Sequence, residues 1–538
     1  MALKSWEIEA NKSKEVLAKS TPKQWLVPED KLPSAETLNV ADFARQSGIL
    51  SGKEVSITEM TATALVAKME KGELTAEEVV VAFLKRATIG QQLLNFATEF
   101  MADEAIARAK ELDAYYEKTG KLVGPLHGIP ISVKEHVGLK GRICHTGYVA
   151  WIKNIATEDA LLVQLLEKAG AVFHVRTNEP QSLMHLDCNN NITGMTVNPY
   201  NRKLSPGGSS GGEGASMGFK CAPLGIGTDI GGSIRGPAAF NGAYGFRPTA
   251  LRMPYDGINL AGDGQESIRC VVGPLAAAGV DDLELFQRAV IDQEPWEIET
   301  SLAPLPWKRV APGKEFTVGI LWDDGIVHPH PPITRGLQYA KKKLEAAGIK
   351  VVDWEPFKHD LGWDIVSTLY FPDVAETQRA ILAESGEPVL PLTEWAFNYA
   401  KPKPLTVTEN WEYNVKREKY RAAYHALMKA RGVDYILSPT FVGVAPELGT
   451  SQYWNYTAIW NILDQPCVVF PTGLVQDPTI DKVEEAYVPR NKQDEREFKK
   501  YVPERFVGAP IALQLTGKHF RDEETIAAAK VVAEIVQS

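Results

Sequence analysis

The sequence has few cysteines, and they are not arranged in pairs. Five occur in 538 residues, at scattered positions, and no Cys-x-x-Cys is present. An odd and scattered set argues against a disulfide framework and is unlike the ligand spacing of a zinc site. We therefore expect a reducing compartment, and we predict a cytoplasmic protein.

Long apolar runs are also missing. No stretch of about 18 apolar residues occurs, so we expect no transmembrane segment. The first residues, from Met1 to Glu7, contain no apolar core of the kind that a signal peptide needs. We expect no signal peptide either.

An excess of basic residues is absent as well. Lysine and arginine number 58 against 68 aspartate and glutamate residues, for a net charge of −10. Binding to a phosphate backbone needs clustered positive charge. The charge balance therefore predicts no nucleic-acid partner.

Strand and helix patterns alternate from about residue 122 onward. Before them, Thr75 and Glu78 form a capping box ahead of an apolar run, which predicts a helix start. Strands separated by helices are typical of an α/β sheet covered by helices on both faces. The expected helices are 161–168 and 334–347, and the expected strands are 171–175, 318–322, 349–354, 435–437, 467–470 and 510–515.

The chain is expected to form one large domain over residues 1–538. Residues 1–55 are polar and irregular, which predicts an N-terminal arm that wraps the body. Residues 475–508 are charged and poor in apolar side chains, which predicts a surface insertion. No internal repeat or low-complexity linker divides the chain.

A glycine-rich segment is the most informative part of the sequence. Eleven glycines occur in the 32 residues from Ser205 to Gly236. Glycine at this density costs backbone entropy, so the loop must have a use for it. A phosphate-binding loop is disfavoured, because Glu213 stands where such a loop needs lysine.

Two arrangements of a serine nucleophile remain open at this point. Residues 207–211 fit Gly-x-Ser-x-Gly, the nucleophile elbow of α/β-hydrolases, in which Ser209 would act with a later histidine. However, residues 198–201 form a turn where a strand should precede the elbow. The other arrangement uses Ser233, which ends a run of small residues whose exposed backbone N–H groups form an anion-binding nest.

Lys134 is the candidate base for Ser233. Apolar residues alternate over 129–133 and face one way in a strand, whereas Ser132 and Lys134 face the other. Burying the charge of a lysine is costly, so a lysine within a sheet is unusual. In the alternative interpretation, Lys134 ends the strand in water or pairs with Glu135.

Taken together, these segments resemble the amidase signature family. Lys134, the block 205–212 and the segment 227–237 carry the resemblance, as does the separation of Ser209 from Ser233. It extends over nearly the whole chain, from about residue 5 to 535, and is greatest to fungal acetamidases and general amidases.

The resemblance implies a fold, a mechanism and a set of site residues. The fold is a single α/β domain with a mixed sheet of about eleven strands between helical layers, and no metal or organic cofactor is implied. Ser233 is the implied nucleophile, Ser209 the bridging serine after a cis peptide from Gly208, and Lys134 the base. The implied oxyanion hole consists of the N–H groups of Ile230, Gly231, Gly232 and Ser233; Ser210, Thr228, Asp229 and Arg235 support the site; Ser182, Leu183 and Met184 contact the substrate.

The expected function is hydrolysis of carboxylic amides through an acyl-enzyme. The expected partners are a small aliphatic or aryl primary amide and water, with longer acyl amides also allowed. An esterase of the α/β-hydrolase type that uses Ser209 and a histidine is the alternative. A tRNA-dependent amidotransferase subunit is a further hypothesis, which the acidic balance disfavours. A homodimer is compatible with the sequence.

Other conspicuous residues receive ordinary interpretations. We predict a surface loop for His328-Pro329-His330 and a buried thiol for Cys188 rather than the nucleophile of a nitrilase-like site. For the aromatic cluster we predict core packing, with the lining of an acyl pocket as the second interpretation. The cluster comprises Tyr453, Trp454, Tyr456 and Trp460.

Overall fold

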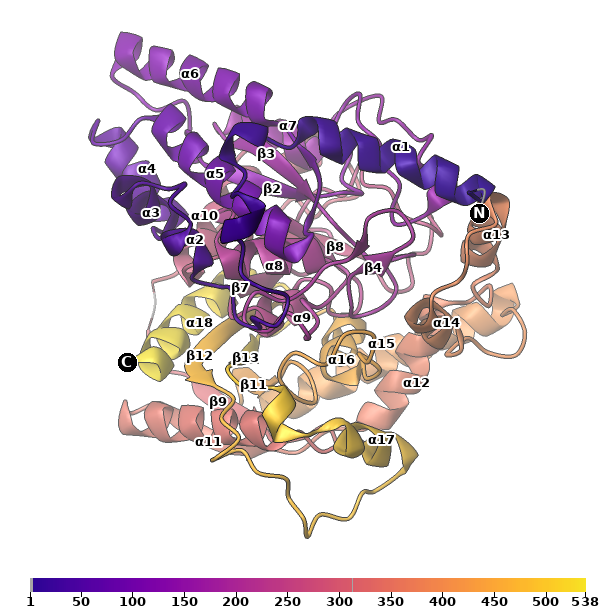
Figure 1. Ribbon diagram of the computed structural model, residues 1–538. Coiled ribbons are helices and arrows are strands. Elements are labelled where there is room, and N and C mark those ends of the chain that lie inside the picture. The colour runs from indigo at the N-terminus through magenta and orange to yellow at the C-terminus, as the bar shows by residue number, and fades with distance from the viewer. Residues whose placement is uncertain (1–2, 312) are drawn as a thin grey trace.

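A computed structural model describes residues 3–311 and 313–538 of the chain (Figure 1). Its strands are β1 (Ala97–Phe100), β2 (Pro130–Lys134), β3 (Val172–Thr177), β4 (Asn189–Asn190), β5 (Gly194–Met195), β6 (Leu224–Asp229), β7 (Tyr244–Arg247), β8 (Val271–Ala276), β9 (Thr317–Leu321), β10 (Lys350–Trp354), β11 (Tyr435–Pro439), β12 (Cys467–Val475) and β13 (Pro510–Thr516).

The helices flank these strands along the whole chain. They are α1 (Ser5–Ser20), α2 (Phe43–Gln46), α3 (Gly52–Thr58), α4 (Ala62–Glu70), α5 (Ala76–Leu94), α6 (Ala102–Thr119), α7 (Leu161–Lys168), α8 (Gly211–Phe219), α9 (Arg235–Phe240), α10 (Val280–Ile291), α11 (Pro331–Ala346), α12 (His359–Tyr370), α13 (Glu376–Ser385), α14 (Pro391–Phe397), α15 (Val407–Ala430), α16 (Asn455–Leu463), α17 (Lys492–Lys500) and α18 (Asp522–Gln537).

Eleven strands of the described residues form one mixed sheet, as predicted. Their order is β1-β3-β2-β6-β8-β7-β12-β13-β11-β9-β10. Strands β3, β2 and β6 are parallel to one another, and so are β11, β9 and β10, whereas the strands between these two groups pair antiparallel. The chain is therefore a single α/β domain.

The two faces of the sheet bury two different sets of side chains. Along β12, Val468 and Phe470 belong to one apolar cluster and Cys467 and Val469 to the other, which is the period of two that a strand imposes. The first cluster includes side chains of α10 and α18, and the second includes those of α9, α12 and α16. Helices therefore cover both faces.

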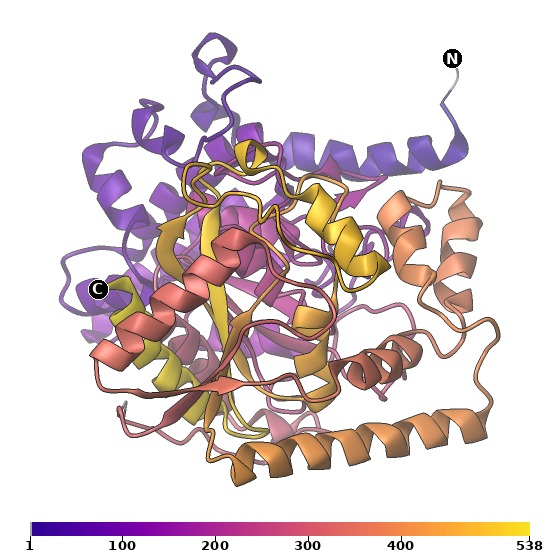
Figure 2. The ribbon, with the colours of Figure 1, turned by 90° about the horizontal axis from the view of Figure 1, so that it is seen from below.

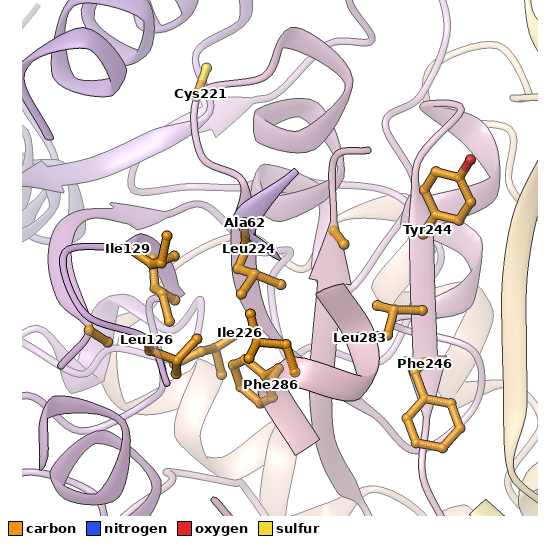
Figure 3. Close-up of a cluster of buried hydrophobic side chains, with 14 of the residues drawn as sticks. Ala62, Leu126, Ile129, Cys221, Leu224, Ile226, Tyr244, Phe246, Leu283 and Phe286 are labelled. Atoms are coloured by element: carbon orange, nitrogen blue, oxygen red, sulfur yellow. The ribbon is translucent and has the colours of Figure 1, made fainter. Parts of the chain in front are cut away.

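Figure 3 shows part of the first cluster, where apolar side chains of β6 and β7 meet helix α10. Leu224 and Ile226 come from β6, and Leu283 and Phe286 come from α10. Each of these side chains is fully buried. This packing fixes β6, whose last residues lead directly into the segment that contains Ser233.

Most of the expected elements occur close to their predicted bounds. Helix α7 spans 161–168, and Thr75 and Glu78 form the predicted capping box of α5. Helix α11 begins three residues earlier than expected, because Pro331 and Pro332 occupy its first positions, where a missing N–H costs nothing. The expected strands lie within one or two residues of β3, β9, β10, β11 and β13. Strand β12 begins at the predicted residue 467 but continues to Val475, five residues beyond the expected end.

The N-terminal segment differs from the expectation of irregular structure. It contains the helix α1, in which Ala10 and Ser13 are the buried residues, together with the short helix α2 and the start of α3. The buried face of α1 is so narrow that its apolar spacing is weak in the sequence. Residues 475–508 contain α17, and they join the last residue of β12 to the strand β13. No helix among the described residues is both long and apolar enough to cross a membrane.

Candidate active site

Lys134 lies at the end of β2, in the interior of the sheet. Ile129, Ile131 and Val133 belong to the first apolar cluster, so the lysine projects from the opposite face, as predicted. Its side chain is fully buried, and its Nζ lies 2.6 Å from Ser209 Oγ and 3.0 Å from Thr228 Oγ1. Burial lowers the pKa of Lys134, against the opposing effect of the Glu179 carboxyl. The alternative of a lysine that ends in water is wrong.

Ser209 is held by the loop that precedes α8. The peptide bond between Gly208 and Ser209 is cis, as the resemblance implies. Gly208 packs so tightly that an added Cβ would lie 2.2 Å from the carbonyl oxygen of Asp187. Glycine is therefore required here, and the loop presents Ser209 toward Lys134.

Thr228 connects Lys134 to a histidine that was not singled out from the sequence. Thr228 Oγ1 lies 3.1 Å from His136 Nε2, and His136 Nδ1 lies 2.6 Å from the carbonyl oxygen of Asn259. Burial lowers the pKa of His136 well below its usual value, with a further contribution from Lys134. His136 is thus a neutral ring at the end of a buried chain of polar contacts. It follows Lys134 by two residues, and that adjacency was its only signal.

The segment after β6 turns sharply and ends at Ser233. Gly232 has a φ of +124°, which glycine adopts readily. The carbonyl of Ile230 accepts from Tyr370 Oη at 2.7 Å, and that of Gly231 accepts from Thr457 Oγ1 at 2.6 Å. Both contacts fix the peptide planes and hence the directions of the N–H groups.

One of the four predicted oxyanion-hole donors is already engaged. The N–H of Gly232 donates to Asp229 Oδ1 at 2.8 Å. Within residues 3–311 and 313–538, the N–H groups of Ile230, Gly231 and Ser233 have no acceptor. In the described part of the chain, three N–H groups of residues 230–233 are therefore free to bind a substrate oxygen.

The backbone segments that carry Ser209 and Ser233 lie side by side. Ser210 N–H donates to the carbonyl of Ser233 at 3.1 Å, and Thr228 N–H donates to Ser210 Oγ at 3.3 Å. In the described part of the chain, no hydrogen bond joins the hydroxyls of Ser209 and Ser233 directly. The structure thus brings Lys134, Ser209 and Thr228 into direct contact and places Ser233 beside them.

Asp229 and Arg235 form a buried ion pair next to this segment. Arg235 donates two hydrogen bonds of 3.0 Å to the carboxylate, and Asn461 donates a third of 2.8 Å. Both charged side chains are fully buried. Burial opposes ionisation, but Arg235 outweighs it and lowers the pKa of Asp229 to about 2. The pair anchors both ends of residues 229–235.

The three predicted substrate residues lie in one buried stretch before the glycine-rich loop. Ser182 and Leu183 have φ values of +67° and +62°. Met184 lines a cavity of about 680 Å³ together with Ile230 and Tyr370. Ser182 and Leu183 are not among the lining residues within the described ranges. Met184 is therefore the member of the trio that faces this space.

The aromatic cluster of residues 453–460 is buried, as predicted. Trp454 stacks on Tyr370 with ring centroids 5.2 Å apart, and Tyr370 lines the cavity. Trp460 packs in the second apolar cluster with Tyr424 and His359. The cluster thus serves core packing and supports the wall of the cavity through Tyr370.

A second group of titratable side chains lies near Lys134. Atoms of Glu135, His145 and Glu179 lie within 4.8 Å of one another, all buried, which is a spacing that metal ligands also show. The carboxylate of Glu135, however, accepts the N–H groups of His145 and Thr146, and the guanidinium of Arg176 lies 3.8 Å away. A further cation is unfavourable beside Arg176, and burial together with Glu135 raises the pKa of Glu179 well above its usual value. The opposite directions of the two pKa shifts favour an ionised Glu135 beside a protonated Glu179.

Two other predictions have different outcomes. Cys188 is a fully buried thiol, as expected. The surface loop predicted at His328-Pro329-His330 is wrong for His330, which is 8% exposed and whose Nε2 lies 2.9 Å from the carbonyl of Glu497. Residues of the 475–508 segment cover this histidine, and sequence spacing carries no signal of that contact.

A nucleophile elbow at Ser209 is not favoured by the contacts. The hydrogen-bond partner of Ser209 Oγ is Lys134. In the described residues, Ser209 shares no hydrogen bond with any histidine that follows it in sequence, namely His328, His330, His359, His425 and His519. The Ser-His arrangement of an α/β-hydrolase is therefore not assembled here.

The chain is similar to known amidases in both sequence and structure. The family model described as Amidase matches residues 78–526. An acetamidase of Emericella nidulans is 40% identical over 546 residues, which cover 99% of this chain and 98% of that protein. An acetamidase of Aspergillus oryzae is 38% identical over 546 residues and covers 99% of both. A solved structure of a fatty acid amide hydrolase matches with a TM-score of 0.97 and 43% identity, covering 99% of this chain and 96% of that one.

The fold and these similarities define an amide hydrolase, an enzyme that cleaves carbon–nitrogen bonds of carboxylic amides. More particularly, the chain belongs to the amidase signature family.

Proposed function

We propose that the protein hydrolyses small carboxylic amides with Ser233 as nucleophile, Ser209 as proton relay and Lys134 as base. The observation that carries the proposal is the contact of 2.6 Å between a fully buried lysine amine and the Ser209 hydroxyl, beside three free N–H groups. A nucleophile, a base and an oxyanion hole within reach of one another are what acyl transfer requires.

The hydrogen-bond chain around Thr228 orients the lysine. His136 Nδ1 faces a carbonyl oxygen, so its proton lies on Nδ1 and its Nε2 accepts. Thr228 then donates its hydroxyl proton to His136 and must accept from Lys134. A neutral amine that donates to Thr228 keeps its lone pair available for the proton of Ser209. His136 is therefore a positioning residue for the base.

The reaction then proceeds in two halves. Ser233 Oγ attacks the amide carbon while its proton passes to Ser209, whose own proton moves to Lys134 Nζ. This transfer needs a side-chain rotation that brings the two serine hydroxyls together. The N–H groups of Ile230, Gly231 and Ser233 stabilise the negative charge on the carbonyl oxygen, each by roughly 3–4 kcal/mol.

Collapse of the tetrahedral intermediate breaks the carbon–nitrogen bond. The proton held by Lys134 returns through Ser209 to the nitrogen, which leaves as ammonia or an amine. A water molecule then attacks the acyl-enzyme ester by the same proton path and releases the carboxylate. Protons balance in each half, and no cofactor enters the scheme.

The lowered pKa of Lys134 agrees with its proposed role. A free lysine has a pKa of about 10.4 and is protonated at neutral pH. Desolvation lowers the pKa of the buried amine, which increases the fraction able to accept a proton. Small aliphatic and aryl primary amides are the proposed substrates, since two fungal relatives are named acetamidases and the Met184 cavity opens beside Ile230.

A cytoplasmic location is proposed with this activity. Cys144, Cys188, Cys221, Cys270 and Cys467 are all free thiols, which a reducing compartment preserves.

The proposal is tested by mapping the modified serine and by a substrate panel. A fluorophosphonate should label Ser233, and Ser233→Ala should lose turnover of acetamide and benzamide by about a million-fold, as expected for a nucleophile. The control is Ser216→Ala, a buried serine on α8, which should retain activity. Labelling of Ser209 instead would support the esterase alternative, and a Ser233→Ala enzyme with normal turnover would refute the assignment.

A further inference from the structure

Tyr370 contacts both the substrate cavity and the backbone that leads to Ser233. It is the last residue of α12, and its side chain lines the cavity of about 680 Å³ together with Met184. Its hydroxyl donates to the carbonyl oxygen of Ile230 at 2.7 Å, and the residue is only 4% exposed. The proposed reaction assigns no task to this hydroxyl.

The hydrogen bond from Tyr370 acts on the N–H of Gly231 through one peptide unit. The carbonyl of Ile230 and the N–H of Gly231 belong to the same planar trans peptide and point in opposite directions. Fixing the oxygen therefore fixes the direction of the N–H. Because linked hydrogen bonds polarise one another, a donor to the carbonyl also makes the N–H a stronger donor. Among the described residues this N–H has no acceptor, so it can bind a substrate oxygen.

Thr457 makes the equivalent contact to the next peptide, with a different consequence. Its Oγ1 donates to the carbonyl of Gly231 at 2.6 Å, which belongs to the same peptide as the N–H of Gly232. That N–H already donates to Asp229 Oδ1 at 2.8 Å. The two hydroxyls therefore hold consecutive peptides, but only the peptide held by Tyr370 offers its N–H to a substrate.

Aromatic packing keeps the Tyr370 hydroxyl at this peptide. The ring stacks on Trp454 with centroids 5.2 Å apart and planes at 28°. An added Cβ at Gly231 would lie 2.6 Å from Trp454 Nε1 and 2.9 Å from Tyr370 Oη, so only glycine lets the two rings approach the backbone this closely. Helices α12 and α16 pack against each other beside the long helix α15 at the lower edge of Figure 2.

The Tyr370 hydroxyl remains a hydrogen-bond donor over the pH range in which the enzyme would work. Burial raises the pKa of Tyr370 well above its usual value, and the carboxylate of Asp229 adds to the effect. Deprotonation of this hydroxyl therefore does not contribute to the pH dependence of the rate, which we assign to Lys134.

We propose that Tyr370 is a positioning residue for the oxyanion hole, which links the wall of the substrate cavity to the N–H of Gly231. This inference rests on the proposed function, since that function assigns the N–H to the carbonyl oxygen of the substrate. The carbonyl oxygen becomes negative only as Ser233 attacks, so the hydroxyl should contribute to kcat. The ring lines the cavity and should contribute to KM.

The test is Tyr370→Phe, which deletes the hydroxyl and keeps the ring. The kcat for benzamide should fall about tenfold, less than the roughly 10²–10³-fold cost of removing a whole oxyanion-hole donor, while KM should change little. Inhibition by phenylboronic acid should weaken by a similar factor, because its tetrahedral adduct with Ser233 places an oxygen in the hole. The pH–rate profile should keep its position.

Two variants serve as matched controls. Thr457→Val removes the hydroxyl at the next peptide and should lower kcat much less, because Asp229 still holds the N–H of Gly232. Tyr501→Phe removes another buried hydroxyl that donates to a backbone carbonyl, that of Asp481 at 2.6 Å in the 475–508 segment. It should match the wild type in kcat and in inhibition by phenylboronic acid.

Three results would overturn the inference: an unchanged kcat in Tyr370→Phe, an equal loss of kcat in all three variants, and a change confined to KM. Failure of the proposed function gives a different pattern, in which Ser233→Ala retains turnover or a fluorophosphonate labels Ser209. If Ser233 is labelled and phenylboronic acid inhibits the wild type, an unaffected Tyr370→Phe refutes only the role of Tyr370.

Discussion

Thr228 and Asp229 are neighbours at the end of β6, yet they belong to two polar clusters of opposite character. Thr228 contacts Lys134, a fully buried amine whose pKa is lowered by burial. Asp229 contacts Arg235, a fully buried guanidinium that stays charged and holds the pKa of the carboxyl at about 2. Both clusters are fully buried, so depth in the fold does not explain the difference.

The difference comes from what each cation finds as its immediate partner. Arg235 meets an ionised carboxylate at 3.0 Å in a two-pronged contact, which offsets the cost of desolvation. Lys134 meets two hydroxyls, which carry no charge and cannot offset that cost. With only hydroxyl partners, a buried cation has a lowered pKa and loses its proton more easily. With a carboxylate partner, it stays charged and can fix the backbone segment to which the pair belongs.

The largest expected effect on the amide rate comes from removing Lys134, the amine whose partners are uncharged hydroxyls. Lys134→Met keeps the volume and deletes the amine, so amide hydrolysis should fall by about 10²–10⁴-fold, the usual contribution of a general base. Hydrolysis of an activated ester should fall less, because its leaving group needs no proton. Steady-state kinetics on a matched amide and ester would measure both. Equal losses on the two substrates would contradict proton return through Ser209.

The wild-type pH profile belongs to the same prediction. Lys134 must be unprotonated to accept a proton, so the amide rate should rise as pH increases through its pKa. Because burial lowers that pKa, the rise should be complete at a pH below the ordinary lysine value of about 10.4. Lys134→Met should lack this rise. An optimum near pH 5 would be incompatible with the proposed base.

The next largest effect concerns the buried ion pair of Asp229 and Arg235 and is an effect on stability. Asp229→Asn leaves Arg235 buried without a carboxylate, which should lower the free energy of unfolding by about 3–5 kcal/mol. Denaturant unfolding of the purified variant measures it, with Asp353→Asn as control, since Asp353 pairs with Lys341 at the surface and should cost less than about 1 kcal/mol.

The sign of the pH dependence follows from the lowered pKa of Asp229. Its contribution to stability should be present above the unfolded pKa of about 3.9 and lost as pH falls through about 2. An Asp229→Asn protein as stable as the wild type at neutral pH would show that the ion pair does not anchor the segment.

The smallest expected effect on the amide rate comes from substituting His136, the histidine that contacts Thr228. His136→Leu removes the acceptor for Thr228, which then donates to Lys134 and competes with Ser209, so the amide rate should fall by about tenfold, equivalent to 1.4 kcal/mol. His136→Gln restores an acceptor and should recover part of the rate. The pH–rate profiles of both variants are the readout. Equal profiles for the two would leave His136 with a packing role alone.

The predictable part of the fold was the part governed by local periodicity. Helix α7 and the alternation that turns Lys134 away from the first apolar cluster follow from spacing alone. Helix α1 was missed because it buries only a narrow face, and the burial of His330 was missed because a segment more than 140 residues away covers it.

The same limit applies to the site. The residue types and glycine density around Ser209 and Ser233 pointed to acyl transfer before any contact was known. The engagement of the Gly232 N–H by Asp229 and the contact of His136 with Thr228 depend on how the chain folds around β6. Sequence motifs therefore predict which residues form the site. Which acceptor each proton and N–H group binds can be known only from the folded structure.

The position of β13 has a consequence for how the chain folds during its synthesis. Strand β13 (Pro510–Thr516) lies between β12 and β11. Within residues 3–311 and 313–538, it is the only strand that joins β11, β9 and β10 to the rest of the sheet. A nascent chain therefore lacks the strand that joins the two groups until residues 510–516 have emerged from the ribosome. A chain that stops before residue 510 would lack β13, so no ladder of hydrogen bonds would connect β12 to β11 and the sheet would be divided at that point.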